Sequence, residues 1–357
     1  MSIVPKKQRL LLQACLAAVI IATPAASTSP PTPQPQPLPP PIGEPVTIPG
    51  PEGPLAGSYV DAGKGAPVAI IIPGSGPTDR NGNNPMGVKA NSYALLAQAL
   101  QSNGVSTLRI DKRGMFGSKA ALSNANVVTM SDYSHDVRGW MKWAQQKTGA
   151  SCIWLIGHSE GGLVALWSTG GHMGRPRSGC GLVLLATPGR PLGIILREQL
   201  AANPANAPLL EAANGAIGAL EAGETVDMAT LPPALAPLFN PEVQPFLREL
   251  MRFDPAEPLR YRRDPVMVVS GGRDLQVTAK DRDAFAANRS VLAGMPQRCI
   301  VTFEAMNHIL KDVPADDRAA NLASYANPAL PLTPGLAPTI AQFIKTNGSR
   351  MGDECQR

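Results

Sequence analysis

The chain has 357 residues, of which 44% are hydrophobic and 17% are charged, and its formal net charge is +5. That length provides for one or two domains with an ample hydrophobic core. Three of the basic residues lie within the first nine positions and no Lys/Arg-rich block follows, so the composition argues against a nucleic-acid-binding protein.

The amino terminus has the layout of a secretory signal peptide. Basic residues precede an apolar stretch over 10–23, and small residues follow it. We predict that residues 1–26 are a signal peptide, that the protein is exported to the periplasm or secreted, and that no stable membrane span remains after cleavage. Two alternatives stay open: a lipoprotein signal that ends at Cys15, and a retained anchor.

A proline-rich segment follows the signal. Residues 30–45, PPTPQPQPLPPPIGEP, contain too many prolines for a helix or a sheet. At ~3.1 Å per residue, a polyproline conformation extends this segment over roughly 50 Å. We interpret 27–45 as a disordered linker, which is either a tether or docking ligand, or an arm without a function of its own.

From residue 46 onward, short apolar runs alternate with helical patterns. Strands are predicted at 66–74, 106–111, 152–157, 181–187, 265–271 and 298–303, after a hairpin at 46–60. Helices are predicted at 92–102, 132–146, 161–168, 281–292 and 336–345. This alternation indicates an α/β fold with a mostly parallel central sheet and helices on both faces.

One connection in this domain is too long to be a simple loop. Residues 191–263 separate two predicted strands, and part of this segment has apolar residues at helical spacing. The apolar stripe comprises Val243, Phe246, Leu247, Leu250 and Met251. We predict a helical insertion within a catalytic domain at 46–350, with a tail at 351–357. The insertion is either a lid over an apolar pocket or a segment whose stripe packs on the core.

A buried strand at 152–157 runs into Gly-His-Ser-Glu-Gly, and a helix follows. This is the strand–turn–helix context of the G-x-S-x-G motif, in which the serine is exposed on a sharp turn. Gly157 and Gly161 leave room for the neighbouring strand and helix. Ser159 is therefore the candidate nucleophile, and the helix amino terminus favours negative charge that develops beside it.

A serine nucleophile needs a base, and the base needs an orienting acid. In the order serine, acid, histidine, His308 follows the last predicted strand and Asp274 follows the strand at 265–271. We predict that these two residues complete a triad with Ser159, and Glu304 is the competing acid. The other histidines have other expected places. They are His135 on the surface, His158 packed in the elbow, and His172 as a weaker candidate base.

The chemistry also needs two backbone N–H groups that face the negatively charged oxygen. One donor is expected from Glu160, the residue after the nucleophile. The other is expected from Ser75, in the Gly-Ser-Gly turn after the strand at 66–74. The side chain of Glu160 either suits the helix dipole or binds a substrate amine.

Five motifs in this order resemble the α/β-hydrolase superfamily and, within it, bacterial esterases and serine aminopeptidase-like hydrolases. The resemblance covers about 46–347. The motifs are PGSGPTDRNGN (73–83), LRIDKRGMFGS (108–118), GHSEGG (157–162), GGRDLQV (271–277) and NHIL (307–310). It implies ester hydrolysis by the predicted triad through an acyl-enzyme, with no cofactor. Separately, the histidines and cysteines are too scattered for a metal site.

The resemblance also suggests a hydrogen-bonded network that braces the oxyanion loop, formed by Asp79, Arg80, Asp111 and Arg113. Family members often have Asp-Arg-Asp where this chain has an asparagine in the third position, so one carboxylate is missing.

The even number of cysteines after the signal invites disulfides in an exported protein. Cys152 and Cys180 begin strands that are neighbours in the fold that the resemblance implies, which brings them within disulfide reach. We predict this pair, and a second bridge from Cys299 to Cys355 in the tail.

The leading interpretation is an exported serine hydrolase that acts on small or medium acyl esters. One alternative is a serine aminopeptidase, which would grip the substrate amine with an acid of the insertion. The candidate acids are Glu211, Glu221 and Glu224. Two further alternatives are a cofactor-free perhydrolase or haloperoxidase and a non-catalytic binding protein on the same fold. Nothing in the sequence points to an oligomeric state.

Overall fold

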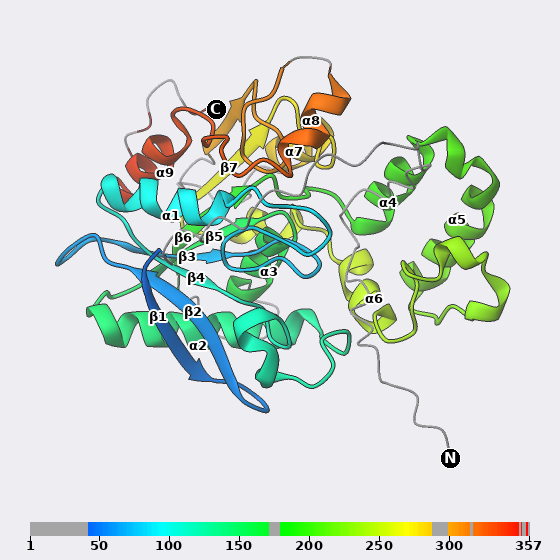
Figure 1. Cartoon of the computed structure of the whole chain (residues 1–357), viewed down its shortest axis with the longest axis horizontal. Helices are drawn as coiled ribbons and strands as arrows, with labels where there is room; N and C mark the ends of the chain where they lie inside the picture. The colour runs from blue at the N-terminus through cyan, green and yellow to red at the C-terminus, as the bar shows by residue number, and fades with distance from the viewer. Residues whose placement is uncertain are drawn as a thin grey trace, which may run out of the picture.

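The computed structural model describes residues 42–170, 179–287, 299–314 and 317–349, together with 351 and 355. Its centre is an eight-stranded sheet in the order β1-β2-β4-β3-β5-β6-β7-β8 (Figure 1). The strands are β1 (Glu44–Pro49), β2 (Pro54–Val60), β3 (Val68–Ile72), β4 (Ser106–Ile110), β5 (Ile153–His158), β6 (Gly179–Leu185), β7 (Val266–Gly271) and β8 (Cys299–Phe303). The pairs β1–β2 and β2–β4 are antiparallel and all others are parallel. The predicted α/β-hydrolase fold is thus confirmed.

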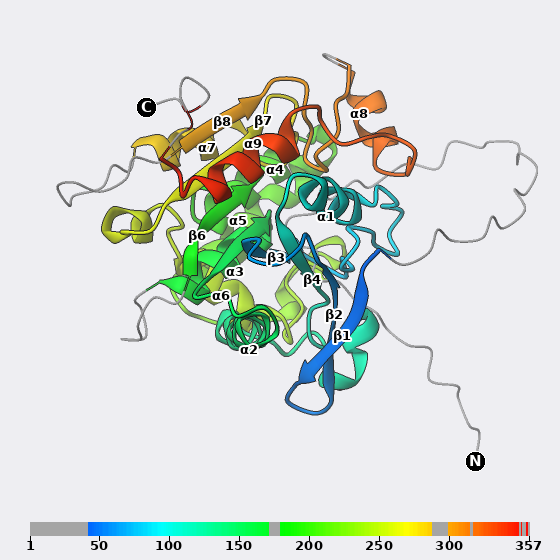
Figure 2. The same ribbon diagram turned by 90° about the vertical axis from the view of Figure 1, so that its left-hand side faces the viewer.

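Helices cover both faces of this sheet. They are α1 (Ser92–Ser102), α2 (Met130–Thr148), α3 (Glu160–Thr169), α7 (Ala279–Ala287) and α9 (Leu336–Lys345), with a 3₁₀ turn η1 (Phe116–Ala121). A short helix, α8 (Arg318–Ser324), binds the loops that follow β7 and β8. Figure 2 shows α2 and α9 on opposite sides of the strands. Alternate strand residues accordingly join two apolar clusters: Ile70 packs with α2 and α3, and Ile71 packs with α1 and α9. β3 is buried on both faces, as its continuous apolar sequence predicts.

The segment between β6 and β7 is helical, as predicted. It contains α4 (Leu192–Ala201), η3 (Pro204–Leu209), α5 (Leu210–Glu221), η4 (Met228–Thr230), η5 (Pro233–Leu235), α6 (Gln244–Arg252) and η6 (Glu257–Tyr261). In Figure 1, α4, α5 and α6 gather on the side of the molecule away from β1 and β2. The apolar stripe of α6 is buried, and the Phe246 ring lies 5.9 Å from the Tyr133 ring of α2. The stripe therefore packs on the core.

Both predicted cysteine pairs are disulfides. Cys152 bonds to Cys180 with the Cα atoms 5.2 Å apart, and Cys299 bonds to Cys355 with the Cα atoms 4.7 Å apart. The first bridge joins the starts of adjacent strands β5 and β6, and the second ties the tail to the edge strand β8.

Some expectations differ from the structure or fall outside it. β1 begins at Glu44, two residues before the predicted start of the domain, and α8 has no counterpart among the predicted helices. The predicted signal peptide, nearly all of the linker 27–45, and His172 lie outside the described residues. Within the described ranges, no helix is long and apolar enough to cross a membrane.

Candidate active site

Ser159 sits at the turn between β5 and α3 with φ 54° and ψ −123°, a conformation that non-glycine residues rarely adopt. The two glycines on either side of this turn have no side chains, so the backbone of the turn can approach the neighbouring segments closely. A methyl group on Gly161 would lie 2.7 Å from the Pro73 carbonyl oxygen, and one on Gly157 would overlap the backbone of α3. Ser159 is 2% exposed, and its Oγ has no hydrogen-bond partner among the described residues. A strained, unpartnered hydroxyl at the end of the central strand is thus available for chemistry.

Asp274 and His308 meet beside this turn. Asp274 follows β7 and His308 follows β8, and His308 Nδ1 lies 2.8 Å from Asp274 Oδ2. The other carboxylate oxygen of Asp274 accepts hydrogen bonds from the N–H groups of Gln276 and Val277. These bonds fix the carboxylate, which in turn holds the imidazole at Nδ1; no hydrogen bond of His308 Nε2 occurs within the described part of the chain. Glu304, the competing acid, is exposed.

His158 is buried and links the elbow to the His308 loop. Its Nε2 lies 2.7 Å from the His308 carbonyl oxygen, and its ring centroid lies 4.9 Å from that of His308. Its Nδ1 lies 2.8 Å from the Tyr93 hydroxyl of α1, and Tyr93 also accepts from the Gly74 N–H. A carbonyl only accepts, so His158 donates from Nε2 and accepts from Tyr93 at Nδ1.

Burial, followed by the neighbouring His308, lowers the pKa of His158 to about 3. The ring is therefore neutral near pH 7, and its tautomer is set by the two partners. Burial likewise raises the pKa of the Tyr93 hydroxyl, so that Tyr93 remains a donor. This hydrogen-bonded chain connects the loop at Gly74 to the backbone of His308. The sequence placed His158 in the elbow but gave no signal for Tyr93.

The predicted donors of the oxyanion hole lie next to Ser159. A Cβ atom built on Gly74 would be 3.3 Å from Ser159 Cβ, so the loop at Gly74–Ser75 touches the nucleophile. Among the described residues, neither the Ser75 N–H nor the Glu160 N–H has a hydrogen-bond acceptor. Two free N–H groups beside an unpartnered hydroxyl are the arrangement that stabilises an oxyanion.

The side chain of Glu160 has a partner that the sequence did not suggest. Glu160 is fully buried, and its Oε1 lies 3.2 Å from Nζ of Lys112, which follows β4. The same ammonium donates to the Gly74 carbonyl oxygen at 2.8 Å. Glu160 lies in the first turn of α3, as the helix-dipole role expects, and it also pairs with a buried ammonium, which neither expected role of its side chain included. The only sequence signal for Lys112 was its position directly after a strand that ends at the same sheet edge.

The four residues of the predicted bracing network do not all bind one another: Arg80 pairs with Asp111, whereas Asp79 and Arg113 have other partners. Arg80 binds Asp111 through its backbone N–H and its guanidinium, with Nη2 2.7 Å from Oδ2. Asp79 instead accepts backbone N–H groups within its own loop. Arg113 turns to α2, where it binds Asp132 and Asp136. Its guanidinium binds two carboxylates of that helix, and the sequence gave no indication of these pairs because the residues are far apart in the chain.

Arg109 is a further member that the sequence did not reveal. It is buried on β4 and donates to the side-chain oxygen of Asn81, the position where relatives often have an aspartate, and to the carbonyl of Ile42. Burial, followed by the nearby Arg80, lowers the pKa of Arg109 to about 10. The side-chain oxygen of Asn81 therefore accepts a hydrogen bond from Arg109, as the aspartate of relatives could, but it adds no negative charge to the loop.

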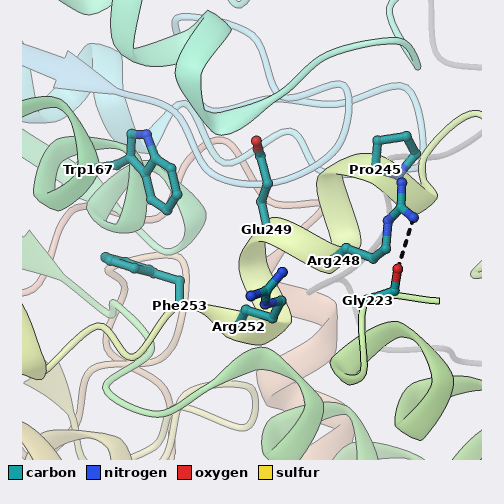
Figure 3. A pocket seen from close by; sticks show the side chains of 7 residues that line it. All are labelled: Trp167, Gly223, Pro245, Arg248, Glu249, Arg252 and Phe253. Atoms are coloured by element: carbon teal, nitrogen blue, oxygen red, sulfur yellow. Dashed lines mark hydrogen bonds between the residues drawn. The ribbon is translucent and has the colours of Figure 1, made fainter. Parts of the chain in front are cut away.

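A cavity of about 660 Å³ lies beside Trp167, near the carboxyl end of α3, whereas Ser159 stands at the amino end of that helix. Figure 3 shows the side chains that line the cavity. It is lined by Trp167, Gly223, Pro245, Arg248, Glu249, Arg252 and Phe253. The Trp167 and Phe253 rings lie 5.2 Å apart, and Arg248 donates to the Gly223 carbonyl. The cavity forms where α6 packs beside α3, and no member of the candidate triad lines it.

The start of the insertion lies against the loop that carries Asp274. Gln199 of α4 donates to the carbonyl oxygen of Gln276 at 3.2 Å. Arg190, just before α4, binds both Glu198 and the buried Asp281. Of the insertion acids proposed to grip an amine, Glu221 binds Arg197 at 2.6 Å, and Glu211 and Glu224 are exposed.

Comparison with known proteins gives distant relatives. Esterase EstD of Thermotoga maritima is 25% identical over 268 residues, which cover 74% of this chain and 57% of that protein; the chain thus spans less than two thirds of this relative. The esterase Pf2001 of Pyrococcus furiosus has a similar structure, with a TM-score of 0.50 and 16% identity over 85% of this chain and 91% of the other. Est1E of Butyrivibrio proteoclasticus gives a TM-score of 0.49 at 15% identity over 85% and 98% of the two chains.

The Pf2001 structure supports the fold, and the family rests on the sequence itself. The family model described as "Alpha/beta hydrolase family" matches residues 69–324, which is more than half of the chain. The protein therefore belongs to the alpha/beta hydrolase family.

Proposed function

We propose that this hydrolase is an exported serine esterase that cleaves small or medium carboxylic esters through an acyl-enzyme. The observation that carries the proposal is the 2.8 Å contact between Asp274 and His308 beside the strained, unpartnered Ser159. The curated relative is named an esterase. Membership of the family alone leaves the type of bond open, so ester cleavage is the part that needs a test.

In the proposed reaction, Ser159 Oγ attacks the ester carbonyl while His308 Nε2 takes its proton. Asp274 stabilises the resulting imidazolium, and the N–H groups of Ser75 and Glu160 receive the negative charge of the carbonyl oxygen. His308 then returns the proton to the leaving alkoxide. Water, activated by His308 in the same way, releases the acid and restores Ser159.

The hydrogen bond from Ser159 to His308 is not formed in the structure. Such bonds are often long or poorly aligned before substrate binds. A rotation of the Ser159 side chain about Cα–Cβ changes the direction of Oγ without moving the backbone. We expect this rotation when substrate occupies the site.

Export is supported by the signal-like amino terminus and by two disulfides, which persist in oxidising compartments. The position of α4 beside the Asp274 loop supports a lid formed by that helix. The aminopeptidase alternative is weakened, because Glu160 and Glu221 are already neutralised by Lys112 and Arg197.

The test is an activity panel on the purified, oxidised protein. It comprises nitrophenyl esters of increasing acyl length, aminoacyl nitroanilides, and peracid formation from acetate and peroxide. We expect ester hydrolysis to be fastest, and Ser159→Ala to lower kcat by roughly a thousandfold or more. The control Ser102→Ala, at the exposed end of α1, should retain full activity.

Labelling with a fluorophosphonate should modify wild type and the Ser102 control but not the Ser159 variant. Faster cleavage of the nitroanilides, or a predominance of peracid formation, would replace the esterase proposal with one of its alternatives. An unlabelled and inactive wild type would favour a binding protein.

A further inference from the structure

Lys112 is a buried cation that touches both segments of the candidate oxyanion hole. It is 5% exposed, and its Nζ lies 5.5 Å from the ring centroid of Tyr133. It donates to the Gly74 carbonyl oxygen at 2.8 Å and to Glu160 Oε1 at 3.2 Å. One ammonium therefore contacts the peptide that contributes the first donor and the residue that contributes the second.

The bond to Gly74 sets the direction of the Ser75 N–H. That N–H and the Gly74 carbonyl belong to one peptide unit, and no cis peptide occurs among the described residues. In a planar trans peptide the C=O and the N–H point in opposite directions. When Lys112 holds the carbonyl on its side, the Ser75 N–H must point away from Lys112.

The rest of Gly74 is held as well. Its own N–H donates to the Tyr93 hydroxyl at 3.1 Å. A Cβ on Gly74 would lie 3.3 Å from Ser159 Cβ, so a rotation of this peptide would change what the nucleophile faces. Both polar groups of Gly74 are thus engaged, whereas the Ser75 N–H has no acceptor among the described residues.

A gain in folding stability does not by itself explain why Lys112 and Glu160 form a buried ion pair. Removing two charges from water costs about as much as their attraction returns, and an apolar pair often fills the same space equally well. In addition, Glu160 Oε2 is buried without a partner in the described part of the chain. The carboxylate does give the ammonium a counter-charge, which keeps a cation beside the Gly74 carbonyl.

We propose that Lys112 is a positioning residue for the oxyanion hole: its ammonium holds the Gly74 carbonyl so that the Ser75 N–H faces the space in front of Ser159, and Glu160 keeps the ammonium in place. This inference rests on the proposed function, because it assigns a role in that same site. The ligand that it concerns is the oxyanion of the tetrahedral intermediate in ester cleavage.

The main variant combines Lys112→Met with Glu160→Gln, so that no unpaired charge remains buried. The backbone N–H of residue 160 is retained. Because losing an oxyanion donor costs about a hundred- to a thousandfold in rate, a misdirected donor should lower kcat for esters by about tenfold to a hundredfold. KM should change by less than about twofold, since ground-state contacts remain. Affinity for a trifluoromethyl ketone, which forms an oxyanion on the serine, should fall in parallel with kcat.

Two further variants separate positioning from a structural role. Lys112→Arg keeps a cation that can donate to both partners, and its kcat should recover by about tenfold over the double variant. The matched control is Arg262→Met with Asp264→Asn, which removes a buried ion pair before β7, at the opposite edge of the sheet. It should lower the free energy of unfolding while leaving kcat and ketone affinity unchanged.

If the main variant does not fold, Lys112→Gln with Glu160→Gln replaces it. Both glutamines are polar and uncharged. The glutamine at position 112 is one bond shorter than lysine, so its amide nitrogen does not reach the Gly74 carbonyl oxygen, and the same loss of kcat is expected. A folded variant with kcat and ketone affinity within twofold of wild type overturns the inference. A loss equally large in the Arg262/Asp264 control also overturns it.

Failure of the proposed function gives a different result. In that case wild type cleaves no ester, whatever residue stands at 112. The rate at which a fluorophosphonate labels Ser159 then still reports on Lys112, because that reaction also develops negative charge on an oxygen beside the serine. If the fluorophosphonate labels wild type and the double variant at equal rates, the positioning role of Lys112 is overturned even without an ester assay.

Discussion

His158 shows how a residue beside the nucleophile can act without joining the reaction. Both of its ring nitrogens are engaged, one by Tyr93 and one by the His308 carbonyl. The ring thus fixes the relative position of the Gly74 loop and the loop that carries the candidate base. A neutral, single-tautomer imidazole suits this task, because a second proton, on Nδ1, would remove the acceptor for the Tyr93 hydroxyl and place two donors against each other.

The lowered pKa of His158 makes a prediction for stability against pH. The pKa is about 3 in the folded protein and ordinarily 6.5. As pH falls below 6.5, the unfolded chain takes up a proton that the folded protein does not, so acid favours unfolding. The resulting loss accumulates from pH 6.5 down to about 3, at no more than about 1.4 kcal/mol per pH unit.

Urea unfolding of wild type and His158→Gln at pH 7 and at pH 4.5 measures this effect. The stability advantage of wild type over the variant should shrink at the lower pH, because only wild type carries the penalty. The exposed His135 of α2 provides the control, and His135→Gln should follow the wild-type profile. Parallel profiles of wild type and His158→Gln would contradict the assignment.

At the scale of elements, the connection from β5 to α3 depends on close backbone contacts. α3 begins directly after Ser159, and Gly161 lies so close to β3 that an added methyl group would stand 2.7 Å from the Pro73 carbonyl oxygen. A glycine inside a helix ordinarily costs stability relative to alanine. Gly161 is needed here because α3 approaches the end of β3 closely. This close approach determines the position of Ser159, which directly precedes α3.

We predict opposite effects for two Gly→Ala substitutions in helices. Gly161→Ala should lower the free energy of unfolding by roughly 1–3 kcal/mol through overpacking, and should reduce esterase activity with it. Gly215→Ala, in α5, has no atom within 4 Å of the added methyl group and should raise stability by up to about 1 kcal/mol. Chemical denaturation of both variants measures the difference. A tolerated Gly161→Ala would show that α3 can move away from β3.

The α6 stripe illustrates a limit of periodicity at this scale. The spacing of its apolar residues predicted the helix correctly, and all five are buried. Periodicity gives the face of a helix that is buried, but not the surface that buries it. α6 packs on α5, α4 and α2, and α4 also lies next to the Asp274 loop.

At the scale of the whole molecule, the two disulfides join positions 28 and 56 residues apart in the sequence. A cross-link restricts the unfolded chain more when it closes a longer loop. For these separations the chain-entropy relation gives about 3.5 and about 4 kcal/mol. Both bridges lie on the amino-terminal side of parallel strands, away from the edge that carries Ser159.

We therefore predict that Cys152→Ser with Cys180→Ser, and separately Cys299→Ser with Cys355→Ser, lower the thermal midpoint by roughly 5–10 °C each. The ester kcat at 25 °C should stay close to wild type, because neither bridge contacts the candidate site. Calorimetry and a room-temperature assay on the same samples measure both quantities. A loss of kcat without a change in midpoint would contradict a purely stabilising role.

The sequence by itself determined most of the strands and helices in their order and the elbow at Ser159, and it predicted Asp274 and His308 as the other members of the candidate triad. Each of these follows from a local signal: an apolar run, a helical period, or a polar residue directly after a strand. Parallel strands carry such residues to one edge of the sheet, so the site could be assembled from short segments. The pair Cys152–Cys180 followed from strands that are neighbours in the fold that the resemblance implied, and the pair Cys299–Cys355 from the two cysteines that remained.

Only the tertiary structure decided which polar side chains meet inside the protein. Lys112 reaches Gly74 and Glu160, Arg109 reaches Asn81, and Arg113 turns to α2 and not to the oxyanion loop. No sequence spacing encodes these contacts, because each joins segments that are remote in the chain and depends on where long side chains end. Burial then requires every charge to find a partner, and the packing of helices on the sheet determines which partner is within reach.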